Sequence, residues 1–125
     1  MIVLDASALL AFLLRERGHR RVAALLGQSC MSTVNLSEVL GRFARVGHDV
    51  AGIAERLMTT PIEWVPFSAD QAAIAAALLP ATADAGLSLG DRACLALASE
   101  RNIRAITADN AWRTLGLGIE IETIR

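Results

Sequence analysis

The first fourteen residues are MIVLDASALLAFLL (1–14), an apolar stretch in which Asp5 is the only charged side chain. The letters MIVL predict a buried strand, and the residues after Asp5 predict a helix. Ser7 is the better candidate for the N-cap of that helix, so Asp5 needs another explanation. An ionised carboxylate is costly to bury without a partner. The end of this strand is therefore where we expect a functional site.

Four more segments along the chain predict strands, at residues 30–33, 62–67, 103–107 and 119–123. Helical patterns separate them, at residues 7–14, 20–27, 35–47, 50–59, 69–79, 89–101 and 110–115. Strands that alternate with helices predict right-handed crossovers and a mostly parallel sheet with helices on both faces. We expect an α/β fold with five strands, the last of them at an edge, and a loop over residues 80–86.

Composition and charge narrow the class of protein. A chain of 125 residues with 54% hydrophobic residues suits a single globular domain, residues 1–125. No window approaches the roughly 20 apolar residues of a membrane span, and the start lacks the basic region of a secretory signal, so we expect a cytoplasmic protein. Cys30 and Cys94 are predicted to be small buried hydrophobic residues. All twelve basic residues are arginine, which excludes mechanisms that need lysine.

Four acids follow predicted strands or begin predicted helices, and this topology places all four at one end of the sheet. They are Asp5, Glu38, Asp91 and Asp109. In open parallel sheets, ligands bind at the carboxyl ends of the strands, where the strand order reverses. A local explanation also exists for three of them. Asn35-x-x-Glu38 and Ser88-x-x-Asp91 resemble capping boxes, and Asp109 suits an N-cap, so each of these acids alone is explained by its own helix.

Taken together, the acids favour a metal site. Carboxylates that lie close to one another repel, and some would protonate unless a cation neutralised them. Oxygen ligands without histidine or cysteine suit Mg²⁺, with Mn²⁺ as the alternative, rather than zinc. A divalent cation held by acids can bind a phosphate and activate water, which is what phosphodiester hydrolysis needs.

The segments VLDASALLAFL, NLSEV, GLSLGDRACLALA and TADNAW, in this order and at these intervals, resemble the PIN-domain family, and within it the VapC-type toxins of bacterial toxin–antitoxin pairs. The resemblance covers Asp5 to Trp112. It implies a three-layer α/β/α sandwich and a metal-dependent endoribonuclease. It also implies a homodimer and a cognate antitoxin that covers the active site and carries the complex to operator DNA, with no membrane association.

The resemblance also implies roles for individual residues. Asp5 and Asp91 match the main Mg²⁺ ligands, whereas Glu38 and Asp109 match further acids that serve as base or as additional ligands. Polar positions beside the acids are expected to orient carboxylates or water; these are Ser7, Asn35 and Thr107. Arg92 and Arg113 lie near the same edge and are predicted to contact the RNA backbone.

Other functions fit the residues less well. A receiver-type phosphoacceptor domain would need a lysine, and a nucleotide-binding Rossmann module would need glycines after the first strand, where this chain has Asp5-Ala6-Ser7-Ala8. The alternative that stays open is a PIN-like binding module that acts mainly by forming a complex with its antitoxin on operator DNA.

Overall fold

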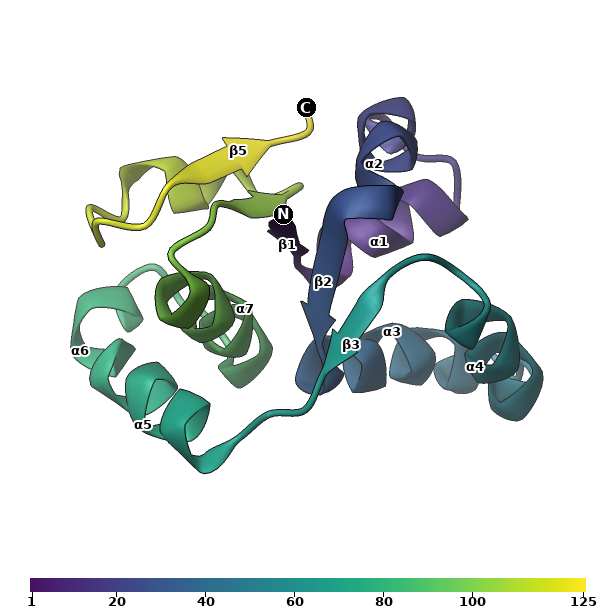
Figure 1. Cartoon of the computed structure of the whole chain (residues 1–125), viewed down its shortest axis with the longest axis horizontal. Coiled ribbons are helices and arrows are strands. Elements are labelled where there is room, and N and C mark those ends of the chain that lie inside the picture. Colours follow the sequence, from purple (N-terminus) through teal and green to yellow (C-terminus); the bar gives the residue numbers. More distant parts are fainter.

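Five short strands form one sheet in the computed structural model, which describes residues 1–125. The strands are β1 (Ile2–Leu4), β2 (Ser29–Ser32), β3 (Glu63–Val65), β4 (Ala105–Thr107) and β5 (Ile121–Thr123). Their order is β3-β2-β1-β4-β5, and every neighbouring pair is parallel. The predicted α/β fold with a mostly parallel five-stranded sheet is confirmed, and the sheet is parallel throughout (Figure 1). The last strand lies at an edge, as predicted.

Helices connect the strands and cover both faces of the sheet. The α-helices are α1 (Ala6–Leu13), α2 (His19–Leu25), α3 (Thr33–Arg45), α4 (Val50–Met58), α5 (Ala69–Ala77), α6 (Leu79–Thr82) and α7 (Leu89–Arg101), and the short 3₁₀ helices are η1 (Leu26–Gln28) and η2 (Asn110–Thr114). Most boundaries lie within two residues of the predicted ones, and two of the differences have a clear cause. The helix expected from residue 35 begins at Thr33, because the Ser32 hydroxyl accepts a hydrogen bond from the N–H of Val34 at 3.2 Å. Part of the loop expected over 80–86 is α6, because proline is well tolerated in a first helical turn.

Alternating residues of the strands pack into two separate cores on opposite sides of the sheet. Ile2 and Leu4 pack with α1, α2, α3 and α4, whereas Val3 packs with α7 and η2. α5 lies against α7 on the second side (Figure 1). This arrangement is the expected three-layer α/β/α sandwich. Cys30 and Cys94 are buried with free thiols, as predicted. None of the helices combines the length and the apolar composition that crossing a lipid bilayer demands.

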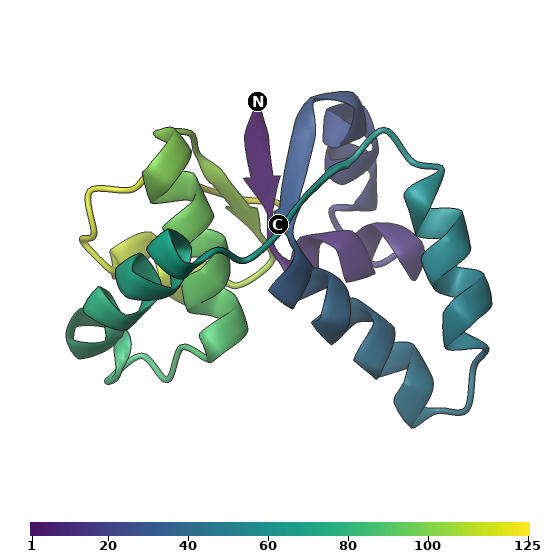
Figure 2. The same cartoon turned by 60° about the horizontal axis from the view of Figure 1, so that its bottom comes forward.

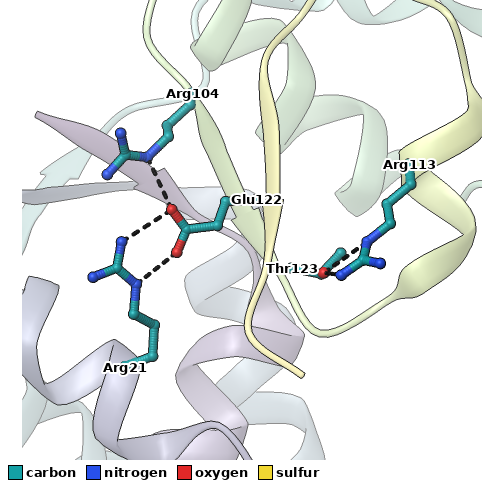
Figure 3. A network of polar contacts seen from close by, with 5 residues as sticks. All are labelled: Arg21, Arg104, Arg113, Glu122 and Thr123. Carbon is teal, nitrogen blue, oxygen red and sulfur yellow. Dashed lines mark hydrogen bonds and ion pairs between the residues drawn. The ribbon is translucent and has the colours of Figure 1, made fainter.

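Ion pairs connect the edge strand β5 to α2 and to the residue before β4. Glu122 accepts from Arg21 Nε at 2.6 Å and lies 3.3 Å from Arg104 Nε (Figure 3). Arg21 belongs to α2, and Arg104 directly precedes β4. The hydrogen bond from Arg21 is the main reason why the pKa of the Glu122 carboxyl is lowered. Two segments far apart in the sequence thus hold one carboxylate of the last strand.

The strand order reverses between β1 and β4. The chain runs from β1 through β2 to β3 on one side, and then returns to place β4 and β5 on the other side. Such a reversal leaves a crevice outside the carboxyl ends of the two central strands. Figure 2 turns these ends forward and shows α1 and α3 starting there. The crevice is therefore the place to look for functional side chains.

Candidate active site

Asp5 lies directly after β1 and is only 3% exposed. Its Oδ1 accepts a hydrogen bond of 2.8 Å from the N–H of Ala8, so Asp5 itself is the N-cap of α1. The prediction that Ser7 caps this helix is wrong: Ser7 lies within the first turn, and its hydroxyl donates back to Asp5 at 2.8 Å. The hydroxyl of Thr107, at the end of β4, donates to Asp5 Oδ2 at 2.6 Å. The two central strands thus meet at one carboxylate.

Backbone amides fix the direction of both hydroxyl groups. The N–H of Ala108 donates to Ser7 Oγ at 2.9 Å, and the N–H of Asp109 donates to Thr107 Oγ1 at 3.0 Å. Each hydroxyl oxygen therefore already accepts a hydrogen, which leaves its own proton for Asp5. The segment after β4 in this way holds the carboxylate in one orientation. These contacts fit the orienting role predicted for Ser7 and Thr107.

The environment of Asp5 disfavours its ionised form. Burial raises the pKa of the carboxyl from its ordinary 3.8 to about 6, although the hydrogen bonds from Thr107, Ala8 and Ser7 oppose the rise. The negative charge of Asp91 adds to the increase. A buried carboxylate beside another acid is the arrangement that a cation would relieve.

Asn35 joins Glu38 to the first turn of α7. Its Nδ2 donates to Glu38 Oε1 at 2.8 Å and to the carbonyl oxygen of Gly90 at 3.0 Å. The capping-box interpretation of Asn35 and Glu38 is wrong, because Ser32 caps α3 and Asn35 is a buried residue inside the helix. Burial raises the pKa of the Glu38 carboxyl; the bond from Asn35 opposes this and the charge of Asp91 adds to it.

Asp91 belongs to a capping box, as the local explanation predicted. Its Oδ2 accepts from the N–H of Ser88 at 2.9 Å, and the hydroxyl of Ser88 accepts from the N–H of Asp91 at 3.2 Å. The charge of Asp91 nevertheless raises the pKa of both Asp5 and Glu38, so it acts on the same site. The capping role and a role in the site are compatible.

Asp109 is the most separate of the four acids. It is exposed and caps η2, with its Oδ1 accepting from the N–H of Ala111 at 2.9 Å. Its connection to Asp5 runs through its backbone N–H and the hydroxyl of Thr107. The predicted N-cap is confirmed, and a role in chemistry for the Asp109 carboxylate stays a prediction.

The two arginines predicted to contact RNA are both engaged within the protein. Arg92 Nη1 donates to the carbonyl oxygen of Ala75 at 3.0 Å, which ties α7 to α5. Arg113 Nε donates to Thr123 Oγ1 at 2.8 Å, and Arg113 Nη2 contacts the same hydroxyl (Figure 3). These bonds occupy part of each guanidinium group, and their contact with RNA stays a prediction.

The chemistry of the donors fits a hard divalent cation. Asp5, Glu38 and Asp91 supply only oxygen ligands. The Oδ1 atom of Asn35 is also buried and has no hydrogen-bond partner, so a further oxygen is available for water or a cation. As the side chains stand, no three acidic, histidine or cysteine groups lie close enough together to share a metal ion. A site that uses three of these acids would therefore need at least one side chain to rotate.

Gly90 is the site residue that sequence reasoning missed. A Cβ atom at this position would collide with the carboxyl group of Glu38. Because glycine weakens a helix relative to alanine, a glycine in the first turn of α7, directly before Asp91, is the signal that was available. Only glycine lets Glu38 lie directly against α7.

Comparisons with known proteins identify relatives of this chain. The family model of the PIN domain matches residues 2–116. A toxin–antitoxin complex from Klebsiella pneumoniae is similar, with 20% identity, a TM-score of 0.75, and coverage of 100% of this chain and 98% of that chain. VapBC2 from Rickettsia felis, bound to a DNA fragment from its promoter, has 16% identity, a TM-score of 0.75 and 98% coverage of both chains. No curated protein matches the chain in sequence.

A third similar structure concerns RNA. VapC20 from Mycobacterium tuberculosis, described as a toxin that cleaves the sarcin–ricin loop, has 20% identity and a TM-score of 0.73, and the match covers 93% of this chain and 95% of that chain. At these levels of identity, the similar structures establish a shared fold.

Proposed function

The chain belongs to the PIN-domain family, and from this premise we propose that it is a VapC-type toxin, a Mg²⁺-dependent endoribonuclease neutralised by a cognate antitoxin. The observation that carries the proposal is Asp5, a buried carboxylate at the reversal of strand order that two hydroxyl groups orient. Glu38 and Asp91 add charge beside it. The fold is also that of a toxin that cleaves the sarcin–ricin loop, which supports RNA as the substrate.

The proposed chemistry assigns a role to each acid. Asp5 and Asp91 would hold the cation, with Glu38 or Asp109 as a further ligand. A divalent ion at this place, Mg²⁺ or Mn²⁺, polarises the scissile phosphate and makes water more acidic. Glu38 or Asp109 accepts a proton from the attacking water, and in-line attack leaves a 5′-phosphate and a 3′-hydroxyl.

The proposal includes partners. An apolar hollow of about 340 Å³, lined in part by Leu13, Phe43 and Leu57, offers a place for an apolar segment of the antitoxin. Leu79 and Leu89 are large exposed apolar residues, at 46% and 52%, and support a homodimer. Operator DNA would be reached only through the antitoxin, and RNA cleavage would take place in the cytoplasm.

The test is cleavage of a mixed RNA pool with Mg²⁺, with EDTA and with the D5N variant. We expect the wild type with Mg²⁺ to cut, and both EDTA and D5N to reduce the rate by about 100-fold or more. Sequencing of the products should find 5′-phosphate ends. Products with 2′,3′-cyclic phosphate would overturn the mechanism, since they would show attack by the 2′-hydroxyl of the RNA itself.

A second candidate is a binding module that acts mainly through an antitoxin complex on operator DNA. The observation in its favour is that similar structures were solved bound to DNA, one of them to a fragment from the promoter. Equal degradation of RNA by wild type and D5N would point to a contaminating nuclease and favour this candidate.

A further inference from the structure

An acidic site poses an electrostatic problem for a polyanionic substrate. The chain has a formal net charge of −1, and the four acids of the candidate site share one end of the sheet. RNA carries a negative charge on every phosphate, so cations near the site are needed to offset the repulsion. The cations available for this are the twelve arginines.

Most arginines form hydrogen bonds or ion pairs within the protein or lie away from the candidate site. Arginines whose guanidinium groups pair with a carboxylate, a carbonyl or a hydroxyl group of the chain are Arg21, Arg92, Arg101, Arg104, Arg113 and Arg125. Arg15, Arg17 and Arg20 follow the far end of α1, the end opposite Asp5. Arg56 lines a different hollow, beside Phe43. Two arginines remain.

These two, Arg42 and Arg45, line a hollow that also contains Glu38. It has a volume of about 400 Å³ and lies between α1 and α3, with the lining residues Ala6, Leu10, Glu38, Gly41, Arg42 and Arg45. Figure 2 shows both helices leaving the carboxyl ends of the strands in the same direction. The hollow therefore begins at the candidate site and leads away from it.

The spacing along α3 orders the charges in a row. Arg42 and Arg45 stand four and seven residues after Glu38, which places all three on one face of the helix, about 6 and 10 Å along its axis from Glu38. Both arginines are exposed and neither forms an ion pair or a hydrogen bond within the chain. Their donors are free for a ligand, and a guanidinium group matches a phosphate with two parallel hydrogen bonds.

Gly41 lines this hollow between Glu38 and the two arginines. A Cβ atom at Gly41 would have no neighbour within 4 Å, so packing against the protein does not require a glycine here. Glycine inside a helix is less favourable than alanine. The absence of a side chain leaves room beside the two arginines.

We propose that Arg42 and Arg45 form a phosphate-binding track, along which a single-stranded segment of RNA lies between α1 and α3 and reaches the acids. The track rests on the proposed nuclease function and adds the path of its substrate. We choose a single-stranded segment because proteins that recognise RNA by sequence mostly bind unpaired loops and ends. The two arginines bind and position the RNA and do not touch the scissile bond.

The test measures binding of a fluorescently labelled 12-nucleotide single-stranded RNA of mixed sequence to D5N protein, which does not cut. We expect Arg42→Gln with Arg45→Gln to weaken binding by about tenfold or more at low salt. The slope of log K against log salt should fall in magnitude by about 1.4, since each phosphate contact on a single strand contributes about 0.7. Arg20→Gln is the control, because Arg20 is exposed and lies outside the hollow. Affinity and slope unchanged in the double variant would overturn the track.

Kinetics and partner binding separate the remaining outcomes. In otherwise wild-type protein, the double variant should raise KM by about tenfold with kcat nearly unchanged. Arg42 and Arg45 also lie in the last turn of α3, where their positive charges interact favourably with the helix dipole. Loss of that interaction alone would lower the melting temperature without changing KM. Wild type that cuts RNA with the same KM as the double variant would refute the track and leave the nuclease standing, whereas wild type that does not cut would refute the nuclease itself. Loss of antitoxin binding with unchanged RNA affinity would assign the hollow to the protein partner and overturn the proposal.

Discussion

The hydroxyl of Thr107 donates a 2.6 Å hydrogen bond to Oδ2 of Asp5 across the point where the strand order reverses. β1 and β4 are neighbours in the sheet, so the residues that follow them meet. One hydrogen bond therefore joins the architecture of the fold to the orientation of the proposed metal ligand.

Thr107→Val should impair both stability and activity. The substitution keeps the shape but removes the proton donated to Asp5 and the acceptor used by the N–H of Asp109. We expect the free energy of unfolding to fall by about 1–3 kcal/mol and the RNA cleavage rate to fall by about 10- to 100-fold. Thr107→Ser keeps the hydroxyl and should stay near wild type. A Thr107→Val protein that stays as stable and as active as the wild type would show that the hydrogen bond to Asp5 does not matter.

Gly90→Ala should separate activity from stability. The new Cβ atom would occupy the place of the Glu38 carboxyl group, and the flexible Glu38 side chain would move away. Because alanine favours a helix, the melting temperature should not fall. We expect a loss of cleavage rate of about tenfold or more, measured with Mg²⁺ at saturating RNA. A fully active Gly90→Ala protein would show that the position of Glu38 does not matter for the reaction.

The stability of the metal-free protein should increase as the pH falls from 7 to 5. The pKa of Asp5 is about 6 in the folded state and 3.8 ordinarily, so ionised Asp5 destabilises the fold above pH 6 and this cost disappears toward pH 4. One pKa unit corresponds to about 1.4 kcal/mol, which gives a gain of about 1.4 kcal/mol between pH 7 and 5 and of about 3 kcal/mol for the full shift toward pH 4. Denaturant unfolding in EDTA measures it, with D5N as the control that should lack the change.

Two other acids limit the range of that experiment. Glu63 and Glu122 have lowered pKa values, chiefly through hydrogen bonds from Arg101 and Arg21. Their stabilising effect is present above pH 4.5 and is lost below it. Measurements between pH 5 and 7 therefore report on the acids with raised pKa values, Asp5 and Glu38, and the difference between wild type and D5N isolates Asp5. A stability that decreases from pH 7 to 5 would contradict the raised pKa.

Asp109→Asn distinguishes a helix cap from a catalytic group. Asparagine caps a helix as well as aspartate does, so the melting temperature should stay within about 2 °C of wild type. The bond from its backbone N–H to Thr107 stays in place, so any loss of cleavage rate reports on the carboxylate itself. We expect a loss of about tenfold, smaller than the loss in D5N. Unchanged cleavage by Asp109→Asn would reduce Asp109 to the cap of η2.

Addition of Mg²⁺ should raise the melting temperature of the wild type. A ligand that binds only the folded state stabilises it by about 2.7 kcal/mol at one hundred times its dissociation constant. D5N and Asp91→Asn should show a much smaller rise, whereas Arg20→Gln should respond like the wild type. A rise of the same size in D5N would place the bound ion elsewhere on the protein.

The sequence predicted the elements better than their ends. Short apolar runs between helical patterns located all five strands, because the burial of a strand depends on its local composition. The start of α3 and the helix around Pro80 were missed, since Ser32 and Pro80 act through single hydrogen bonds and backbone angles. The wrong cap at Ser7 has the same origin: both Asp5 and Ser7 are good caps, and only the chain direction after β1 decides between them.

The sequence by itself determined the α/β fold, the four acids and the absence of lysine, because each depends on residue types and their spacing. Only the tertiary structure decided which side chains meet. Thr107 reaches Asp5 across 102 positions of the chain, and Asn35 reaches Gly90 across 55. In the tertiary structure Arg42 and Arg45 are unpaired beside Glu38, whereas Arg92 and Arg113 donate hydrogen bonds to other parts of the chain. Hydrogen bonds form only at short distances and narrow angles, and those are set by the packing of helices on the sheet.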